Sequence, residues 1–143
     1  MKIRIVNRST HPLPEYQSAG AAGLDLRAFL PQPVTLAPLE RQLIPTGLFL
    51  QIPDGYEVQV RPRSGMSFKR GLTLVNTPGT VDSDYRGELL IPVINLDRQP
   101  QTIEDGDRIA QMVVAKYERV EWTLAESLED SPRGASGFGS TGS

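Results

Sequence analysis

Glycine and proline divide this chain into short segments. The 143 residues include 13 glycines and 12 prolines, which are spread along the chain and separate one apolar run from the next. Turn signals lie at residues 53–55 (Pro-Asp-Gly), 78–79 (Pro-Gly) and 105–107 (Asp-Gly-Asp). This distribution is typical of many turns between short strands rather than of disorder. We therefore predict one domain of the all-β class, a sandwich or barrel of short strands.

Apolar and polar residues alternate within these segments, which is the period of a strand buried on one face. The strands predicted in this way lie around residues 3–5, 24–26 and 56–60, and residues 109–114 are a further strand candidate. The run 89–94 is apolar on both faces, so it is expected to lie deep. Proline cannot donate a ladder hydrogen bond, so Pro92 is expected at an edge, a bulge or a strand end.

Two segments have helical features. Residues 64–70 are expected to form a short turn of helix, and residues 123–130 another, with Thr123 as N-cap and Glu126 three residues further on. Residues 131–143 are rich in glycine, serine and threonine, and Phe138 is their bulky residue. Composition favours a flexible tail, and an aromatic among glycines also suits a flap that a ligand orders. We expect a β domain over 1–130 and a tail over 131–143.

Composition excludes several classes of protein. With no cysteine, the chain has no disulfide, thiolate zinc site or cysteine nucleophile. The one histidine, His11, lies in a loop-like context and is expected to face solvent, so zinc hydrolysis and serine–histidine catalysis are poorly supported. A net charge of -2 implies no basic field for nucleic acid. We find no signal-peptide core or membrane-length apolar run and expect a cytoplasmic protein.

Carboxylates, hydroxyls and arginines remain to carry chemistry. Asp25, Asp82 and Asp84 are candidates for magnesium, which is usually held through waters by one or two carboxylates plus substrate phosphates. Taken alone, Asp25 also suits the polar side of a strand, and residues 79–87 suit a hairpin with charged edges. Residues 61–65 (Arg-Pro-Arg-Ser-Gly) suit phosphate oxygens, although arginines beside a surface turn are common. No Walker sequence occurs.

Five stretches, in this order along the chain, resemble the motifs of the homotrimeric dUTPase family. They are 22–28 (Ala-Gly-Leu-Asp-Leu-Arg-Ala), 62–71 (Pro-Arg-Ser-Gly-Met-Ser-Phe-Lys-Arg-Gly), 76–88 (Asn-Thr-Pro-Gly-Thr-Val-Asp-Ser-Asp-Tyr-Arg-Gly-Glu), 106–112 (Gly-Asp-Arg-Ile-Ala-Gln-Met) and 133–142 (Arg-Gly-Ala-Ser-Gly-Phe-Gly-Ser-Thr-Gly). The third and fifth are the most specific. Thr80 stands where the family usually has a bulkier aliphatic residue, and Ser136 where glycine is frequent; neither change removes a reactive group.

The resemblance implies a jelly-roll-like β fold, the β-clip of the family, and a homotrimer. Its active sites are expected between subunits, each completed by the C-terminal tail of another chain. The implied reaction is magnesium-dependent hydrolysis of dUTP to dUMP and pyrophosphate, which keeps uracil out of DNA and supplies dUMP for thymidylate synthesis. Magnesium and arginines would neutralise phosphate charge, and an aspartate would aim the water.

The resemblance also implies a role for each motif residue. Asp82 is the expected base for the attacking water, and Asp25 is expected to hold magnesium through water. The residues implied at the phosphates are Arg63, Ser64, Gly65 and Gln111. Those implied at the nucleoside are Asn76, Gly79, Thr80, Val81, Tyr85 and Arg86, with Tyr85 under the deoxyribose, where it leaves no room for a 2′-hydroxyl. Those implied in the tail are Arg133, Gly139, Ser140 and Thr141, towards the γ-phosphate, and Phe138, stacked on uracil.

Two alternatives stay open. A dCTP deaminase has a related fold, but the position that we align with its acid–base carboxylate is Pro92, which cannot exchange a proton. Deaminases also generally lack a tail with a residue like Phe138. A non-enzymatic nucleotide-sensing or protein-binding module would be expected to lose the base or the tail, and both are present here.

Overall fold

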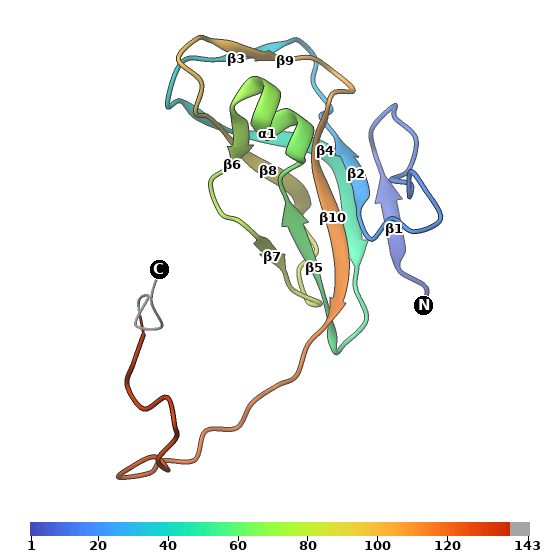
Figure 1. The fold of residues 1–143 in the computed structure, drawn as a ribbon. Helices are drawn as coiled ribbons and strands as arrows, with labels where there is room; N and C mark the ends of the chain where they lie inside the picture. The colour runs from blue at the N-terminus through green and yellow to red at the C-terminus, as the bar shows by residue number, and fades with distance from the viewer. Residues whose placement is uncertain (138–143) are drawn as a thin grey trace.

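The structure is a computed structural model that describes residues 1–137. Two four-stranded antiparallel sheets pack face to face, and a two-stranded sheet lies beside α1 at one end (Figure 1). The all-β prediction is confirmed. Phe138, Gly139, Ser140 and Thr141, which the sequence places in the site, lie outside the described residues.

The order of strands in each sheet fixes which segments lie together. The first sheet has the order β1 (Arg4–Asn7), β4 (Arg41–Gln51), β8 (Glu88–Asn95) and β6 (Leu72–Leu74). The second has the order β2 (Leu24–Arg27), β10 (Arg108–Lys116), β5 (Tyr56–Arg61) and β7 (Gly79–Val81). The small sheet pairs β3 (Val34–Leu36) with β9 (Gln101–Ile103), and the helix α1 spans Ser64–Arg70. The helix is too short and polar to cross a membrane.

The core lies between the two large sheets. Leu26 and Val58 of the second sheet and Ile44 and Ile91 of the first are fully buried there. Their neighbours in sequence point the other way, as the alternation of a strand requires. The period-two pattern therefore predicted β2 and β5 correctly and a strand that overlaps β1; β10 contains the further candidate at 109–114, and α1 has its predicted bounds.

The strand β8 differs from its prediction because only one of its faces is covered. Leu89, Ile91 and Val93 are buried, whereas Leu90 is 42% exposed and Pro92 is partly exposed. The expectation that both faces of this run lie deep is wrong for the single chain. An apolar face of the first sheet is therefore left open.

Pro92 lies inside β8 rather than at its end, and β8 is not an edge strand. Its carbonyl accepts a hydrogen bond from the Val75 N–H (2.9 Å), so its nitrogen also faces that side. β6 ends at Leu74, one residue earlier. The missing N–H of Pro92 therefore falls just beyond the end of the neighbouring strand.

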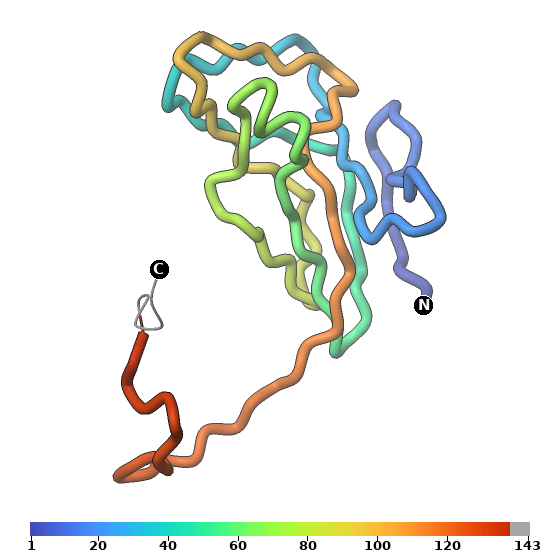
Figure 2. The backbone as a smooth tube through the Cα atoms, viewed as in Figure 1, coloured from blue at the N-terminus to red at the C-terminus, as the bar shows by residue number. Residues whose placement is uncertain are grey.

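Two local predictions are wrong. Residues 79–87 form no hairpin, because β7 pairs with β5 and β8 pairs with β4 and β6, so this segment crosses between the sheets. Residues 123–130 form no helix; the chain from 117 to 137 has neither helix nor strand and runs away from the sheets (Figure 2). Trp122 is 89% exposed and Leu124 fully exposed. A helix this short is marginal without an apolar surface to pack on.

Candidate active site

A row of polar side chains crosses the outer face of the second sheet. Gln111 on β10 pairs with Asp25 on β2 and with Arg61 on β5. Paired residues in an antiparallel sheet point to the same face. The next residues along each strand, among them Leu26 and Val60, are buried in the core. The sheet therefore presents Asp25, Gln111 and Arg61 together on its outer side.

Two arginines hold the carboxylate of Asp25. The Arg63 Nε donates to Oδ1 (2.7 Å), and the Arg108 Nη1 donates to Oδ2 (3.2 Å). The Arg63 Nη1 also reaches the carbonyl of Arg108 (3.4 Å). Only 12% of the Asp25 side chain is exposed. We call Asp25, Arg63, Arg108 and Gln111 the Asp25 cluster; two positive charges and one negative charge favour anionic ligands there.

Gln111 is fixed by the space around it. Its Nε2 donates to the carbonyl of Pro62 (3.0 Å), the residue before Arg63. A Cβ at Gly23 would lie 2.4 Å from the Gln111 Oε1. Glycine at position 23 therefore leaves the room that the amide occupies, and Gln111 ties β10 to the segment that carries Arg63.

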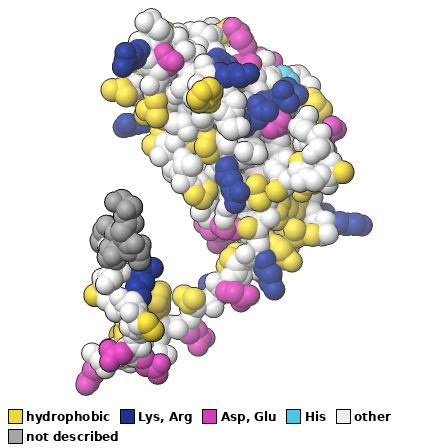
Figure 3. Space-filling view, in the orientation of Figure 1, with side chains coloured by type: hydrophobic (Ala, Val, Ile, Leu, Met, Phe, Trp, Pro, Cys, Tyr) yellow, Lys and Arg dark blue, Asp and Glu magenta, His cyan; other side chains and the backbone are white. Residues whose placement is uncertain are grey.

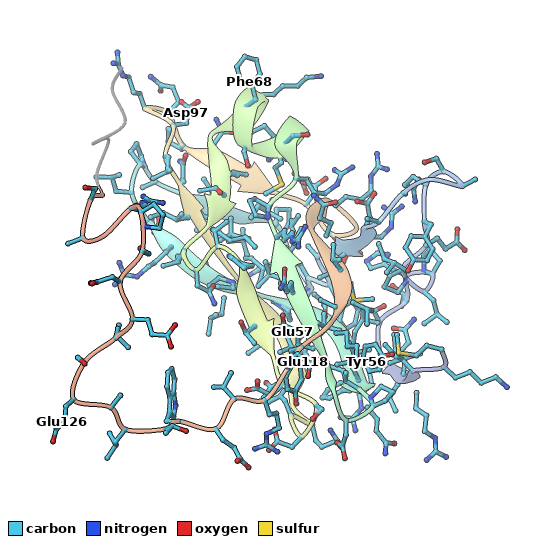
Figure 4. The ribbon with its side chains drawn as sticks, turned by 60° about the horizontal axis from the view of Figure 1, so that its bottom comes forward. Tyr56, Glu57, Phe68, Asp97, Glu118 and Glu126 are labelled. Carbon is cyan, nitrogen blue, oxygen red and sulfur yellow. The ribbon has the colours of Figure 1, made fainter. Side chains whose placement is uncertain are left out.

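The start of α1 places Ser64 and Gly65 beside Arg63. Arg63 has extended backbone (φ -97°, ψ 129°), and its carbonyl accepts the N–H groups of Met66 (3.1 Å) and Ser67 (3.0 Å). The side chain of Met66 is buried and anchors the helix, whereas Ser64 and Gly65 are exposed. A hydroxyl and an open backbone thus lie next to the guanidinium of Arg63, as the sequence predicts. Near the other end of the helix, Phe68 projects from the molecule (Figure 4).

Asp82 and Tyr85 belong to a second group of residues. Asp82 is exposed at the end of β7, and its carbonyl accepts the Tyr85 N–H (3.2 Å). The Tyr85 hydroxyl donates to the carbonyl of Glu88 (3.0 Å). A Cβ at Gly87 would lie 2.3 Å from that hydroxyl, so glycine lets the ring lie across the turn.

An open pocket of about 210 Å³ lies beside this turn. Its lining residues are Val60, Thr80, Val81, Asp82, Tyr85, Glu88, Leu89 and Leu90. Asn76 lies near the start of β7, where its Nδ2 would be 3.1 Å from a Cβ on Gly79. Arg86 donates to the carbonyls of Ser83 (2.7 Å) and Tyr85 (2.8 Å) and stiffens the turn. We call the residues from Asn76 to Arg86 the Asp82 turn.

The Asp25 cluster and the Asp82 turn are far apart within one chain. β2 and β7 are the two opposite edges of the second sheet. The register places Asp25 level with Arg61, whereas Asp82 follows Val81, the partner of Val58. Asp25 and Asp82 are three strand spacings of about 4.8 Å apart across the sheet and four residues of about 3.3 Å apart along the strands. Their Cα atoms are therefore about 20 Å apart. The sequence did not indicate this distance, because motifs order residues along the chain and not in space.

The side chains of the described residues show whether the site could hold Mg²⁺. Within residues 1–137, no three His, Cys, Asp or Glu side chains gather closely enough to hold a metal ion. Both oxygens of Asp25 already accept from guanidinium groups. One such carboxylate fits Mg²⁺ when phosphates and water supply the other ligands, which is its usual arrangement in nucleotide sites.

His11 was expected to face solvent, and that prediction is wrong. Its side chain is 18% exposed, and its Nε2 lies 2.9 Å from the Asp105 Oδ1. The ring packs edge-on against Phe29 at 6.2 Å. The Leu30 N–H, and after it His11, hold the pKa of Asp105 below its usual value. This pair fastens the N-terminal loop to the turn before β10.

Arg133 lies apart from both groups in its own chain. It is exposed in the segment after β10, where its Nε donates to the carbonyl of Ser136 (2.9 Å). Acidic side chains line this segment (Figure 3), and Glu126 on it lies away from the sheets (Figure 4). The described structure therefore does not bring Arg133 to the phosphate side of its own chain.

Comparison with known proteins gives one consistent result. A family model described as dUTPase matches residues 9–142. The chain is 54% identical over 142 residues to the deoxyuridine 5′-triphosphate nucleotidohydrolase of Finegoldia magna, with 99% of each covered. It is 52% identical over 140 residues to the enzyme of that name from Cytophaga hutchinsonii, covering 98% of this chain and 91% of the other. Staphylococcus bacteriophage 80alpha dUTPase with dUPNHPP superposes with a TM-score of 0.85 at 27% identity, over 99% of each chain.

Proposed function

The chain belongs to the dUTPase family, and on that premise we propose that it hydrolyses dUTP to dUMP and pyrophosphate with Mg²⁺. The arrangement of the Asp25 cluster carries the proposal, because it joins a carboxylate, two guanidinium groups and an amide, and none of its members is a cysteine or a histidine. Phosphoanhydride hydrolysis needs charge neutralisation and an aimed water more than covalent chemistry.

The phosphates are bound at the start of α1. Arg63 uses its Nε for Asp25, which leaves guanidinium donors for phosphate oxygens. Ser64 offers a hydroxyl, and Gly65 leaves the backbone open to a close approach, since a Cβ there would meet nothing within 4 Å. Bound magnesium supplies charge neutralisation on the triphosphate. Asp25 would hold it through water, and the Gln111 amide would support the same network.

Asp82 is the general base. Its carboxylate is exposed at the end of β7 and can accept the proton of a water molecule within about 2.6–3.2 Å. The water oxygen forms a new bond to the α-phosphorus of dUTP, and the bond between that phosphorus and the oxygen of the leaving pyrophosphate breaks. The proton passes to the Asp82 carboxylate.

The nucleoside lies on the Asp82 turn. β7 is an edge strand, so its outer N–H and C=O groups are free to pair with the edge of a base. Asn76, Gly79, Thr80 and Val81 form this strip. The Tyr85 ring, fixed through its hydroxyl to Glu88, packs under the deoxyribose and leaves no room for a 2′-hydroxyl.

The site is assembled between copies of the chain, as a homotrimer. The separation of about 20 Å supports this, because Asp82 and Asp25 cannot act on one bound nucleotide from the same chain. The open apolar face of the first sheet, where Leu43 is 56% exposed and Leu90 42% exposed, suits a contact between copies.

The tail completes the site of another copy. The β domain extends over residues 1–130, and the tail over 131–143 carries Arg133 towards the γ-phosphate and Phe138 onto uracil. The direction of the segment after β10, away from its own sheets, supports this arrangement (Figure 2). We place the protein in cytoplasmic nucleotide metabolism, where this reaction keeps uracil out of DNA and supplies dUMP.

The experiment is a substrate panel. The purified full chain is incubated with Mg²⁺ and with dUTP, dCTP, dTTP or UTP, and dUMP, pyrophosphate and ammonia are measured. We expect dUMP and pyrophosphate from dUTP, strong preference over the other nucleotides, and loss of turnover with EDTA. Ammonia from dCTP without dUTP hydrolysis would assign the chain to the deaminases instead. Binding of dUTP without any product would indicate a nucleotide sensor.

A further inference from the structure

A β-bulge lies at the start of β10. Ala110 pairs with Leu26, but Arg108 pairs with Arg27, so Ile109 is an extra residue in the ladder. Side chains alternate along a strand, and an unbroken ladder would turn Arg108 towards the core together with Ala110. The bulge instead buries Ile109 and Ala110 side by side, at 1% and 0% exposure, and turns Arg108 outward.

The bulge directs Arg108 to Asp25. The Arg108 Nη1 binds Oδ2 at 3.2 Å, while the Arg63 Nε binds Oδ1 at 2.7 Å. The two arginines come from different elements and hold different oxygens, so the carboxylate plane is fixed from both sides. Arg108 itself is 42% exposed, more than Arg63 at 26%.

In the proposed reaction Arg63 binds both Asp25 and the phosphates, whereas Arg108 binds Asp25. Arg63 must turn its remaining donors to the phosphates while it holds Asp25, so any shift of Arg63 towards a phosphate also pulls on Oδ1. A carboxylate held by one hydrogen bond can rotate about its bond to Cβ. A second donor on the other oxygen prevents that rotation.

We propose that Arg108 is a positioning residue for this reaction, an inference that rests on the proposed function. It fixes Oδ2 of Asp25, so the carboxylate keeps the orientation in which it would hold Mg²⁺ through water while Arg63 engages the phosphates. Arg108 therefore determines how tightly Mg²⁺ binds in the nucleotide complex, and it contributes little to nucleotide binding without metal.

The test uses Arg108→Lys, which keeps the charge and loses the planar guanidinium. Mg²⁺ is titrated calorimetrically into the full chain with a non-hydrolysable dUTP analogue. We expect Mg²⁺ affinity to fall about 10- to 100-fold, the usual effect of removing a partner that orients a metal-binding group. Analogue affinity in EDTA should match that of the parent.

Arg70→Lys is the matched control. The Arg70 Nη1 binds the Asp107 Oδ2 at 3.1 Å with similar exposure, but it touches no member of the Asp25 cluster. It should leave Mg²⁺ affinity unchanged. If Arg108→Lys lowers thermal stability more than Arg70→Lys does, Arg108→Gln is measured in the same way.

A double-mutant cycle separates positioning from a general structural role. With Asp25→Asn in place, Arg108→Lys should cause no further loss of Mg²⁺ affinity, because it acts through that carboxylate. Parent-like Mg²⁺ affinity in both Arg108 variants, or an undiminished effect on the Asp25→Asn background, would overturn the inference. Parent turnover of dUTP is a separate readout, and its absence would contradict the proposed function instead.

Discussion

Gln111 occupies space that only glycine at position 23 leaves open. Gly23→Ala should displace the Gln111 amide and break its bond to the Pro62 carbonyl, without straining the backbone. We expect a folded protein with turnover lowered about 10- to 100-fold, since misplacing a site by an ångström has such effects. Gly20→Ala is the control, because a Cβ there meets no atom within 4 Å. Equal turnover in the two variants would remove Gln111 from the site.

Asp82 is assigned the role of accepting a proton from water, and the amide of an asparagine in its place cannot accept that proton. Asp82→Asn should keep the fold and the binding of a dUTP analogue, because the amide is nearly isosteric. Turnover should fall at least about 10²-fold, the scale of general-base catalysis. Asp54→Asn, an exposed aspartate in the turn between β4 and β5, is the control and should hydrolyse dUTP like the parent. Near-normal turnover of Asp82→Asn would remove the assignment.

Asp105 links a residue-scale interaction to pH. Its pKa is lowered in the folded chain by the Leu30 N–H and then by His11. A lowered carboxyl pKa stabilises the fold above the unfolded value of 3.8, and that stability is lost as pH falls through the folded value. Asp105→Asn should therefore be less stable than the parent in urea at pH 6, and the difference should shrink below the usual carboxyl range. A pH-independent difference would contradict this account.

At the scale of elements, local patterns succeeded where neighbours in sequence decide the structure. α1 formed as predicted because Met66 packs into the core and Gly71, with φ of 62°, ends the helix. β4, the longest strand among the described residues, was not predicted, and it contains Pro45 and Gly47, residue types that commonly mark turns. In the structure both residues lie inside a strand with a bulge. The residue that stabilises this bulge is distant in sequence, so local patterns could not predict it.

That residue is Glu88. Its Oε1 accepts the N–H groups of Thr46 (3.1 Å) and Gly47 (2.7 Å), where the β4 register shifts. Glu88→Ala leaves these amides without an acceptor, and about 1–3 kcal/mol of stability should be lost. Urea unfolding measures this, with Glu57→Ala as control because, among residues 1–137, the Glu57 carboxylate accepts a hydrogen bond from the Gln59 side chain alone. Equal stability of the two variants would show that the bulge does not depend on Glu88.

Partners distant in sequence also explain which parts of the site could not be predicted. The motifs identified the residue types at the phosphates and the nucleoside, but Arg108 was missed as a partner of Asp25. Its signal was the pair of adjacent buried residues, Ile109 and Ala110, which breaks the alternation and marks a bulge. The helix expected at 123–130 failed for the opposite reason: its N-cap pattern is local, and its apolar side chains find no surface in their own chain.

At the scale of the whole molecule, two features of the single chain support the proposed assembly. The Asp25 cluster and the Asp82 turn lie on opposite edges of one sheet, and the first sheet keeps an open apolar face. A closed symmetric assembly would cover that face and bring an edge of one copy to an edge of another. Light scattering should give the mass of a trimer at micromolar concentration, and a monomer mass would contradict the assembly.

Complementation between two inactive variants tests the shared site most directly. Asp82→Asn and Arg63→Gln are purified separately, co-refolded in equal amounts, and assayed for dUMP from dUTP. Random mixing should restore about a quarter of the parent turnover per site, because some sites combine an intact Asp82 from one copy with an intact Arg63 from another. If the co-refolded mixture forms the same oligomer as the parent yet stays as inactive as either variant, both residues act within one chain, and the account is contradicted.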